Sequence, residues 1–331
     1  SRVDGVSLPA FCAAAMPRPE VAFGSGRTGG GTMSWGILAG LVAGALWGLV
    51  FIAPRMTPGL SSLDLAAGRF LVYGLLSALL LLAVPGRRRR PTVAQMAWAL
   101  GLSVLGFTGY YWFLVLAIRD AGTEVPTLII GTIPLWVMLL GKPAGLRWQA
   151  LVPGLALTAA GLLLMMGATP QALVTDPGDA RDFSRGVAWA VLAMLCWTAF
   201  AILNSAWLHR HPEVSATQWA NWLGVATGGG ALLMWLALGT PASELLRHPG
   251  FVQSALVCVA TGVGSAWLAT ILWNVASQRL SASLCGQLIV SETVFALVYS
   301  FVLDGRWPGL AQAVAAVLFT FGILFSIRAH R

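Results

Sequence analysis

Apolar runs long enough to cross a lipid bilayer follow one another along almost the whole chain. A hydrocarbon core about 30 Å thick needs about 20 mainly apolar residues per helix, and ten runs of this kind lie between charged or Pro/Gly-rich breaks. The chain is therefore expected to be an all-α, polytopic membrane protein with ten transmembrane helices. The expected spans are residues 33–53, 64–84, 93–118, 125–140, 148–166, 186–206, 217–238, 251–277, 281–303 and 309–327.

Composition excludes an ordinary soluble fold. Hydrophobic residues make up 57% of the chain and charged residues 10%, against about 45–50% and about 25% in soluble proteins. Little of the chain is left outside the spans, which form two groups of five. We expect a disordered, Gly/Pro/Ala-rich leader at residues 1–32 and a first five-helix repeat at 33–166. A polar connecting loop at 167–184 leads to a second five-helix repeat at 185–328 and a cytoplasmic tail at 329–331.

Basic residues are unevenly divided between the two sets of loops. An even number of spans puts both termini on one side, and 13 of the 20 Lys and Arg residues fall on that side, four of them in Arg87–Arg90, against six on the other. Because cytoplasmic loops carry the excess of Lys and Arg, both termini are predicted to be cytoplasmic, in a bacterial inner membrane. The net charge of +8 is then a topology signal and requires no nucleic-acid partner.

The sequence lacks the motifs of ATP-driven transport and of common intramembrane chemistry. It contains no Walker A, HExxH or GxSxG motif, its four cysteines have no paired spacing, and its four histidines lie in loops or at a terminus. We therefore expect no cofactor, no metal site and no enzymatic activity, an intramembrane enzyme being a low-ranking alternative. A pore is also disfavoured, because the spans offer no ring of charge for ion selectivity.

The two halves of the chain resemble each other. Residues around Trp47 in the first span match those around Trp197 in the sixth, and the Gly-rich pattern at 154–161 in the fifth matches 315–322 in the tenth. Each half has five spans, an odd number, so the second half enters the membrane upside down. Inverted repeats are typical of secondary transporters, whose substrate site lies near the midplane between the halves.

Two charged residues interrupt the apolar spans. Glu292 lies at mid-depth in the ninth span, where an ionised carboxylate costs several kcal/mol unless it is paired, solvated or neutral. It either faces a cavity, where it binds a substrate ammonium or exchanges a proton, or is a protonated carboxyl bonded to a neighbouring helix. Arg69 lies about 7–8 Å into the second span, either as a clamp for a substrate carboxylate or as a structural anchor that snorkels to the interface. A transported amino acid needs one partner of each charge.

Aromatic and amide side chains within the spans are further candidates. Aromatic faces suit flat or cationic substrates, and amides inside lipid must find partners across helices or in a wet cavity. The repeat pairs Trp47 with Trp197, and the inverted topology puts them on opposite sides of the midplane, where a matching pair could gate a central cavity. Helix packing is the competing explanation for each aromatic residue. The other candidates are Tyr111, Trp112, Trp136, Trp273, Asn274 and Gln287.

Glycines recur at every fourth residue of the first span, at Gly36, Gly40, Gly44 and Gly48. Such a stripe lets another helix backbone approach closely. Static packing is its default interpretation, and a hinge role is the alternative.

These residues carry a resemblance to the drug/metabolite transporter superfamily in its ten-helix, EamA-type form. The likeness covers roughly residues 33–328 and rests on Ala45-Leu46-Trp47-Gly48, Ala67-Gly68-Arg69-Phe70, Thr132-Ile133-Pro134-Leu135 and the Gly-rich stretch at 154–161. Pro134 has no proline counterpart in the ninth span, where Glu292 stands. Within the superfamily the chain is most similar to the bacterial aromatic amino-acid exporters of the YddG type. That resemblance implies export of phenylalanine, tyrosine, tryptophan and some cationic aromatic drugs, through a cavity lined by spans 3, 4, 8 and 9.

We therefore expect a secondary transporter that exports aromatic amino acids and related amphipathic or cationic aromatic compounds by alternating access. Its expected partners are a small-molecule substrate and membrane lipid, and ten spans can enclose a cavity in one chain, so a monomer would suffice. The alternative within the superfamily is a sugar-phosphate or nucleotide-sugar carrier. Those substrates are dianionic and would want two or more intramembrane Lys or Arg residues, whereas this chain has one.

Overall fold

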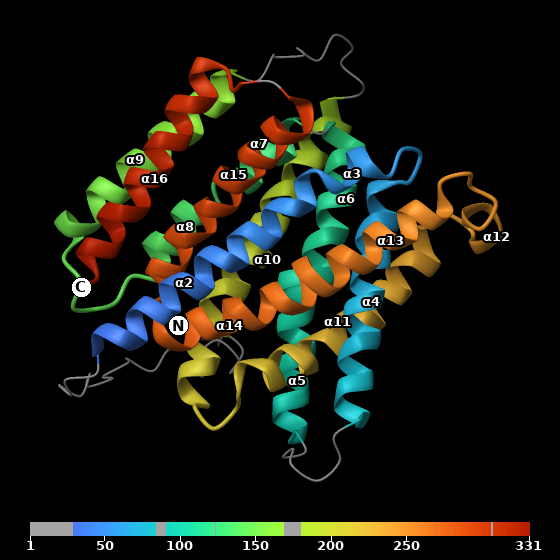
Figure 1. Ribbon diagram of the computed structural model, residues 1–331, viewed down its shortest axis with the longest axis horizontal. Coiled ribbons are helices and arrows are strands. Elements are labelled where there is room, and N and C mark those ends of the chain that lie inside the picture. The colour runs from blue at the N-terminus through green and yellow to red at the C-terminus, as the bar shows by residue number, and fades with distance from the viewer. Residues whose placement is uncertain (1–28, 84–90, 123, 169–179, 306) are drawn as a thin grey trace, which may run out of the picture.

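The chain folds into a bundle of helices (Figure 1). The computed structural model describes residues 29–83, 91–122, 124–168, 180–305 and 307–331. Most of the expected leader, residues 1–28, lies outside the described residues. The longer elements are α2 (Gly29–Gly48), α4 (Ser62–Ala83), α5 (Val93–Ser103), α6 (Gly109–Ala121), α7 (Glu124–Gly131), α8 (Ile133–Leu140), α9 (Trp148–Ala168), α10 (Ala180–Arg210), α11 (Ala216–Leu238), α13 (Phe251–Thr261), α14 (Ala269–Arg279), α15 (Ala282–Asp304) and α16 (Leu310–Ala329). Short elements are η1 (Leu49–Phe51), α3 (Ala53–Met56) and α12 (Ala242–Leu245).

Nine helices of the described part are long and apolar enough to cross a bilayer. The expected fourth span is instead two short helices, α7 and α8, which meet at Thr132. Pro134 stands in the first turn of α8, where its missing N–H removes no helical hydrogen bond. The Thr132 hydroxyl donates to the Ile129 carbonyl at 2.6 Å and so satisfies a backbone group at the break.

The helix bounds differ from expectation on both sides of the connecting segment. Helix α9 continues to Ala168, and α10 begins at Ala180, so residues expected in the loop at 167–184 are helical at both ends. Asp182 lies in the first turn of α10, where a carboxylate is favoured by the helix dipole. The Arg185 guanidinium pairs with Asp182 at 3.0 Å one turn later. Local charge pairing thus extends the helix into a polar stretch that hydropathy marks as a loop.

Helix contacts follow a twofold pattern that exchanges the two halves. Helix α4 packs along its counterpart α11, and α9 along its counterpart α16 (Figure 1). Helix α2 packs against α14 and α15, and its counterpart α10 packs against α6, α7 and α8 in the matching way. The arrangement of contacts is that of two five-helix units related by a pseudo-twofold axis.

The glycines of α2 face α14 and α15. A Cβ on Gly40 would lie 2.6 Å from Leu288 Cδ1, and one on Gly48 would lie 3.1 Å from the Ala296 nitrogen. The stripe therefore serves close helix contact, which is the packing interpretation of the sequence pattern.

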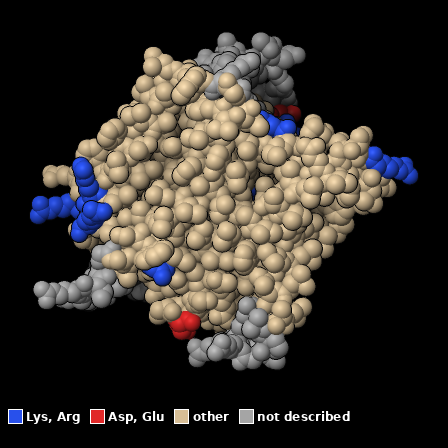
Figure 2. All heavy atoms as spheres, viewed as in Figure 1, with Lys and Arg blue, Asp and Glu red and all other residues tan. Residues whose placement is uncertain are grey.

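Apolar side chains cover the outside of the bundle. Leu82, Val252 and Leu233 are 76%, 70% and 69% exposed, an arrangement suited to lipid. Figure 2 shows a broad uncharged area, with Lys, Arg, Asp and Glu side chains near its edges.

A π-helical segment interrupts each of the third and eighth spans. Segment η2 (Val104–Thr108) joins α5 to α6, and η3 (Gly262–Leu268) joins α13 to α14. These two spans are counterparts in the two halves. Wide turns of this kind are rare, and they occur frequently at functional sites.

Candidate binding cavity

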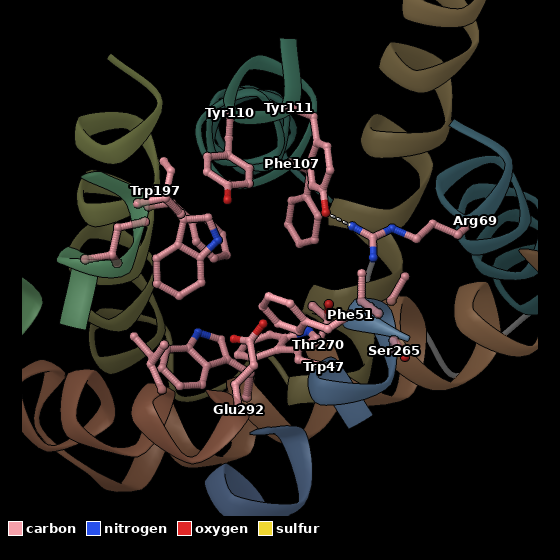
Figure 3. A pocket seen from close by; sticks show the side chains of 18 of the residues that line it. Trp47, Phe51, Arg69, Phe107, Tyr110, Tyr111, Trp197, Ser265, Thr270 and Glu292 are labelled. Carbon is pink, nitrogen blue, oxygen red and sulfur yellow. Dashed lines mark hydrogen bonds between the residues drawn. The ribbon is translucent and has the colours of Figure 1, made fainter. Parts of the chain in front are cut away.

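A cavity of about 190 Å³ lies in the interior of the bundle (Figure 3). Its walls come from both halves and include residues of α2, η1, α4, α6, α7, α8, α10, α14 and α15, together with both π segments. Gly106 and Phe107 belong to η2, and Ser265 and Ala266 belong to η3. The aromatic lining residues are Trp47, Phe51, Phe70, Phe107, Tyr110, Tyr111, Trp197, Phe200 and Trp273.

Three tryptophans form one part of the wall. The ring centroids of Trp47 and Trp273 are 5.2 Å apart, and Trp197 lies 6.2 Å from each of them. The inverted topology predicts Trp47 and Trp197 on opposite sides of the midplane, and in the structure their rings meet edge to face. The repeat-paired tryptophans therefore share a single wall.

Phenylalanines continue this wall across the third and sixth spans. Phe200 lies 5.9 Å from Trp197 and 5.4 Å from Phe107, and Phe107 lies 5.7 Å from Phe70. These centroid distances are in the range of favourable edge-to-face contact. The result is a continuous apolar surface that can stack on a flat substrate.

Arg69 closes one side of the cavity. Its guanidinium donates to the Tyr111 hydroxyl, and its Cζ lies 4.7 Å from the Phe70 ring centroid and 4.9 Å from that of Tyr111. These contacts hold the cation by hydrogen bonding and cation–π attraction. The Nε–H is buried without a hydrogen-bond partner among the described residues. Arg69 therefore brings its positive charge to the cavity wall, where Tyr111 and Phe70 hold it in place.

Glu292 lies across the cavity from Arg69 (Figure 3). It occupies the middle of α15, and its side chain is partly exposed to the cavity. Among described residues no hydrogen bond or ion pair reaches its carboxyl, although the positive charge of Arg69 acts on it electrostatically. The cavity thus presents one cation and one carboxyl, with no direct contact between them.

The cavity lies at the middle of most of the spans that line it. Phe107 and Ser265 are in the middle of the third and eighth spans, and Glu292 is in the middle of α15. Trp47 comes from the last turn of α2, and Arg69 from the first half of α4.

Six of the ten candidate residues line this cavity: Glu292, Arg69, Trp47, Trp197, Tyr111 and Trp273. The other four lie elsewhere. Trp112 packs near Leu63 and Met234. Trp136 is 43% exposed, and its indole donates to the Thr132 hydroxyl.

The two amides in the candidate set belong to buried polar networks away from the cavity. Asn204 donates to the Asn274 carbonyl oxygen at 3.1 Å and accepts from the Trp219 indole at 2.7 Å. Gln287 donates to the Thr158 hydroxyl at 2.9 Å and accepts from the Ser326 hydroxyl at 3.0 Å. Both networks join helices, which is the first of the two options considered for polar groups inside lipid.

Other lining residues were not in the candidate set. Phe70, Phe107 and Phe200 gave no signal because phenylalanine is unremarkable in an apolar span. Ser265 and Thr270 are small hydroxyl residues, and the Ser265 hydroxyl donates to the Leu46 carbonyl at 2.5 Å. The repeat could have pointed to them, since the two π segments occupy corresponding places.

The fold and the cavity define a polytopic α-helical membrane transporter built from two repeated units. The profile of the EamA-like transporter family matches residues 34–167 and again residues 184–328. The chain belongs to this family and is an EamA-type secondary transporter of metabolites. The prediction that it is not an enzyme is confirmed by the family.

Two relatives match almost the full chain. Inner membrane protein YtfF of Escherichia coli K12 is 32% identical over 308 residues, covering 89% of this chain and 95% of its own. Aromatic amino acid exporter YddG of Ancylobacter novellus is 23% identical over 295 residues, covering 86% and 94%. A protein of known crystal structure, 22% identical, superposes with a TM-score of 0.71 over 90% of this chain and 99% of its own, which shows the shared fold.

Proposed function

We propose that this transporter exports aromatic amino acids, together with related amphipathic or cationic aromatic compounds, by alternating access. The observation that carries the proposal is the cavity itself, in which a cation and a carboxyl face each other between aromatic walls.

The two charges match the two ends of an amino-acid zwitterion. Arg69 offers the positive charge of its guanidinium at the cavity wall to a carboxylate, and guanidinium–carboxylate hydrogen bonds are among the stronger ones in proteins. Glu292 offers to an ammonium group a carboxyl that makes no hydrogen bond or ion pair among the described residues. A neutral zwitterion would satisfy both without leaving a net charge in a low-dielectric site.

The walls suit an aromatic side chain. The tryptophan wall and the neighbouring phenylalanines present ring faces and edges to the cavity, and such surfaces bind flat rings and organic cations. One of the two relatives, YddG, is named for the export of aromatic amino acids. YtfF, which shares more identical residues with this chain, is named without a substrate.

A sugar-phosphate or nucleotide-sugar carrier is the weaker candidate. A phosphate dianion would need at least two cations or an equivalent set of donors to offset its desolvation. The lining residues include Arg69 as their one Lys or Arg, and Glu292 would repel such a substrate.

In the proposed cycle the two five-helix halves, 33–166 and 185–328, rock around the cavity so that it opens to one side of the membrane at a time. Both termini lie in the cytoplasm in this proposal, in a bacterial inner membrane.

Transport by purified protein in liposomes tests the substrate class. Labelled tryptophan and phenylalanine should enter, and threonine and a sugar phosphate should not. A viologen-type cation tests the cationic aromatic class. Uptake of the sugar phosphate alone would overturn the proposal.

Fusions after Arg331 test the orientation. Green fluorescent protein becomes fluorescent in the cytoplasm and alkaline phosphatase becomes active outside it. We expect a fluorescent fusion and an inactive phosphatase; the reverse pair would invert the proposed topology.

A further inference from the structure

The carboxyl of Glu292 lacks the hydrogen-bond and ion-pair partners that two carboxyls near the ends of spans, those of Asp64 and Asp120, possess. Asp64 is 5% exposed and accepts hydrogen bonds from the Ser61 hydroxyl and from both the backbone and the hydroxyl of Thr240, at 2.6–2.9 Å. Asp120 pairs with Arg119 at 2.9 Å and with Arg185 at 2.7 Å. Glu292 has no such donors within the described chain.

A carboxylate without donors at the middle of a span is costly, and the cost falls when it binds a cation. The ammonium group of a substrate and a proton are two cations that can reach it through the cavity. Each occupies the same carboxyl oxygens, so the two exclude each other.

We propose that Glu292 is the proton-binding site that couples this transporter to the proton gradient, and that one proton enters the cell for each substrate that leaves. The inference rests on the proposed function, because it takes an amino-acid ammonium as the competing ligand. Outside, a proton replaces the departing ammonium on the carboxyl oxygen. Inside, the O–H bond breaks and the proton passes to water before the next ammonium binds.

Among the residues that line the cavity, Glu292 is the one that carries a carboxyl. The titratable or charged side chains that face it are Arg69 of α4 and Tyr110 and Tyr111 of α6. The lining residues contributed by α2, α8, α10 and α14 are not titratable, as at Trp47, Pro134, Trp197 and Thr270. On the other side, α16 carries no charged residue in its span before Arg328. Tyr299 of α15 itself donates to the Ala45 carbonyl at 3.0 Å.

Competition also explains why the protein would not leak protons or substrate. With neither ligand bound, Glu292 would be a charged carboxylate without a direct partner in a largely aromatic cavity while the two halves change position. That state is unfavourable. The halves would therefore exchange only when the carboxyl holds a proton or an ammonium.

Charge balance gives the exchange an electrical signature. An outgoing zwitterion carries no net charge and the incoming proton carries one, so each cycle moves one positive charge inward. Transport is reversible in liposomes, so an acid interior should drive accumulation by up to about tenfold per pH unit. A potential positive inside should add about tenfold per 59 mV for one charge.

Proton release on binding is the direct test. Tryptophan is added to the full-length protein in weakly buffered detergent solution, and protons released per substrate bound are measured from about pH 5 to about pH 9. We expect a value approaching one at the acid end that falls toward zero at the alkaline end, because only a protonated carboxyl has a proton to give up.

Three variants sharpen the measurement. Glu292→Gln should release no proton and should lose accumulation driven by the pH gradient, whereas Glu292→Asp should retain proton release. Glu244→Gln removes an exposed carboxyl on α12, outside the spans, and should behave as wild type.

The outcomes separate the two proposals. Tryptophan binding without proton release, or equal release from Glu292→Gln and wild type, would overturn the inference and leave the substrate class standing. No binding of tryptophan or phenylalanine would overturn the proposed function, and the inference with it.

Discussion

Helices α4 and α11 touch along a seam of very small residues, and one added methyl group there should be costly. A Cβ on Gly74 would lie 2.5 Å from Gly228 Cα and 3.1 Å from the Gly228 nitrogen. Carbon atoms pack at about 3.5–4.0 Å, so the methyl is at least about 1 Å too close. The atoms it meets are backbone, which cannot rotate away.

The helices must therefore move apart, and the whole seam loses contact. A gap of 0.5–1 Å already forfeits about a quarter to a half of each dispersion contact, and overpacking of this kind typically costs about 1–3 kcal/mol. We expect Gly74→Ala to lower the free energy of unfolding by about this amount. Gly228→Ala, whose Cβ would lie 2.7 Å from Gly74 Cα, should do the same.

Gly229 is the matched control. It follows Gly228 on α11, it is exposed, and a Cβ there would meet nothing within 4 Å. Gly229→Ala should therefore stay within about 0.5 kcal/mol of wild type or be slightly stabilising. The double variant Gly74→Ala/Gly228→Ala should cost less than the sum of the two, since helices already separated by the first methyl accommodate the second.

The free energy of unfolding would be measured by denaturant titration in mixed micelles, with helical circular dichroism as the signal. If Gly74→Ala matched wild type within about 0.5 kcal/mol, or if Gly229→Ala were as destabilising as Gly228→Ala, the argument from close backbone contact would be refuted.

Three further predictions concern the polar residues. Arg69→Gln should lower the affinity for tryptophan about tenfold or more, through loss of a charged hydrogen bond worth about 1.5–3 kcal/mol. The affinity for tryptamine, which lacks the carboxylate, should fall much less. Equal losses for the two ligands in a binding titration would contradict a carboxylate clamp. Asp64→Ala removes the acceptor of three hydrogen bonds from Ser61 and Thr240 and should destabilise the protein by about 1–3 kcal/mol in the same unfolding assay. Gln287→Leu should also destabilise the protein, because the buried hydroxyls of Thr158 and Ser326 lose their hydrogen-bond partner. The affinity of this variant for tryptophan should match that of wild type, and a loss of affinity would place Gln287 in the binding machinery.

The architecture was accessible from the sequence because bilayer thickness fixes the length of an apolar span. The expected all-α, polytopic fold is confirmed, and several helix bounds agree within one or two residues, as at Ala216–Leu238. Hydropathy did not predict the helix bounds where charge pairing or a proline sets them. Charge pairing extends α10 back to Ala180, and Pro134 divides the fourth span in two.

The composition of the cavity was partly accessible. Arg69 and Glu292 stand out in an apolar sequence because burying a charge demands a reason. Which aromatic residue faces inward depends on helix rotation, and neighbours such as Tyr111 and Trp112 point about 100° apart on an α-helix. The structure places Tyr111 in the cavity and Trp112 outside it. A π turn changes this rotation without a sequence signal of its own.

The paired π segments also bear on the history of the chain. Segments η2 and η3 share few residues, reading VLGFT and GVGSAWL, yet they interrupt corresponding spans and both line the cavity. Wide turns of this kind are rare, so one turn present before gene duplication accounts for two copies more simply than two separate origins afterwards. The ancestral five-helix protein would then have carried one such turn, and two copies of it would have contributed the walls of a shared cavity.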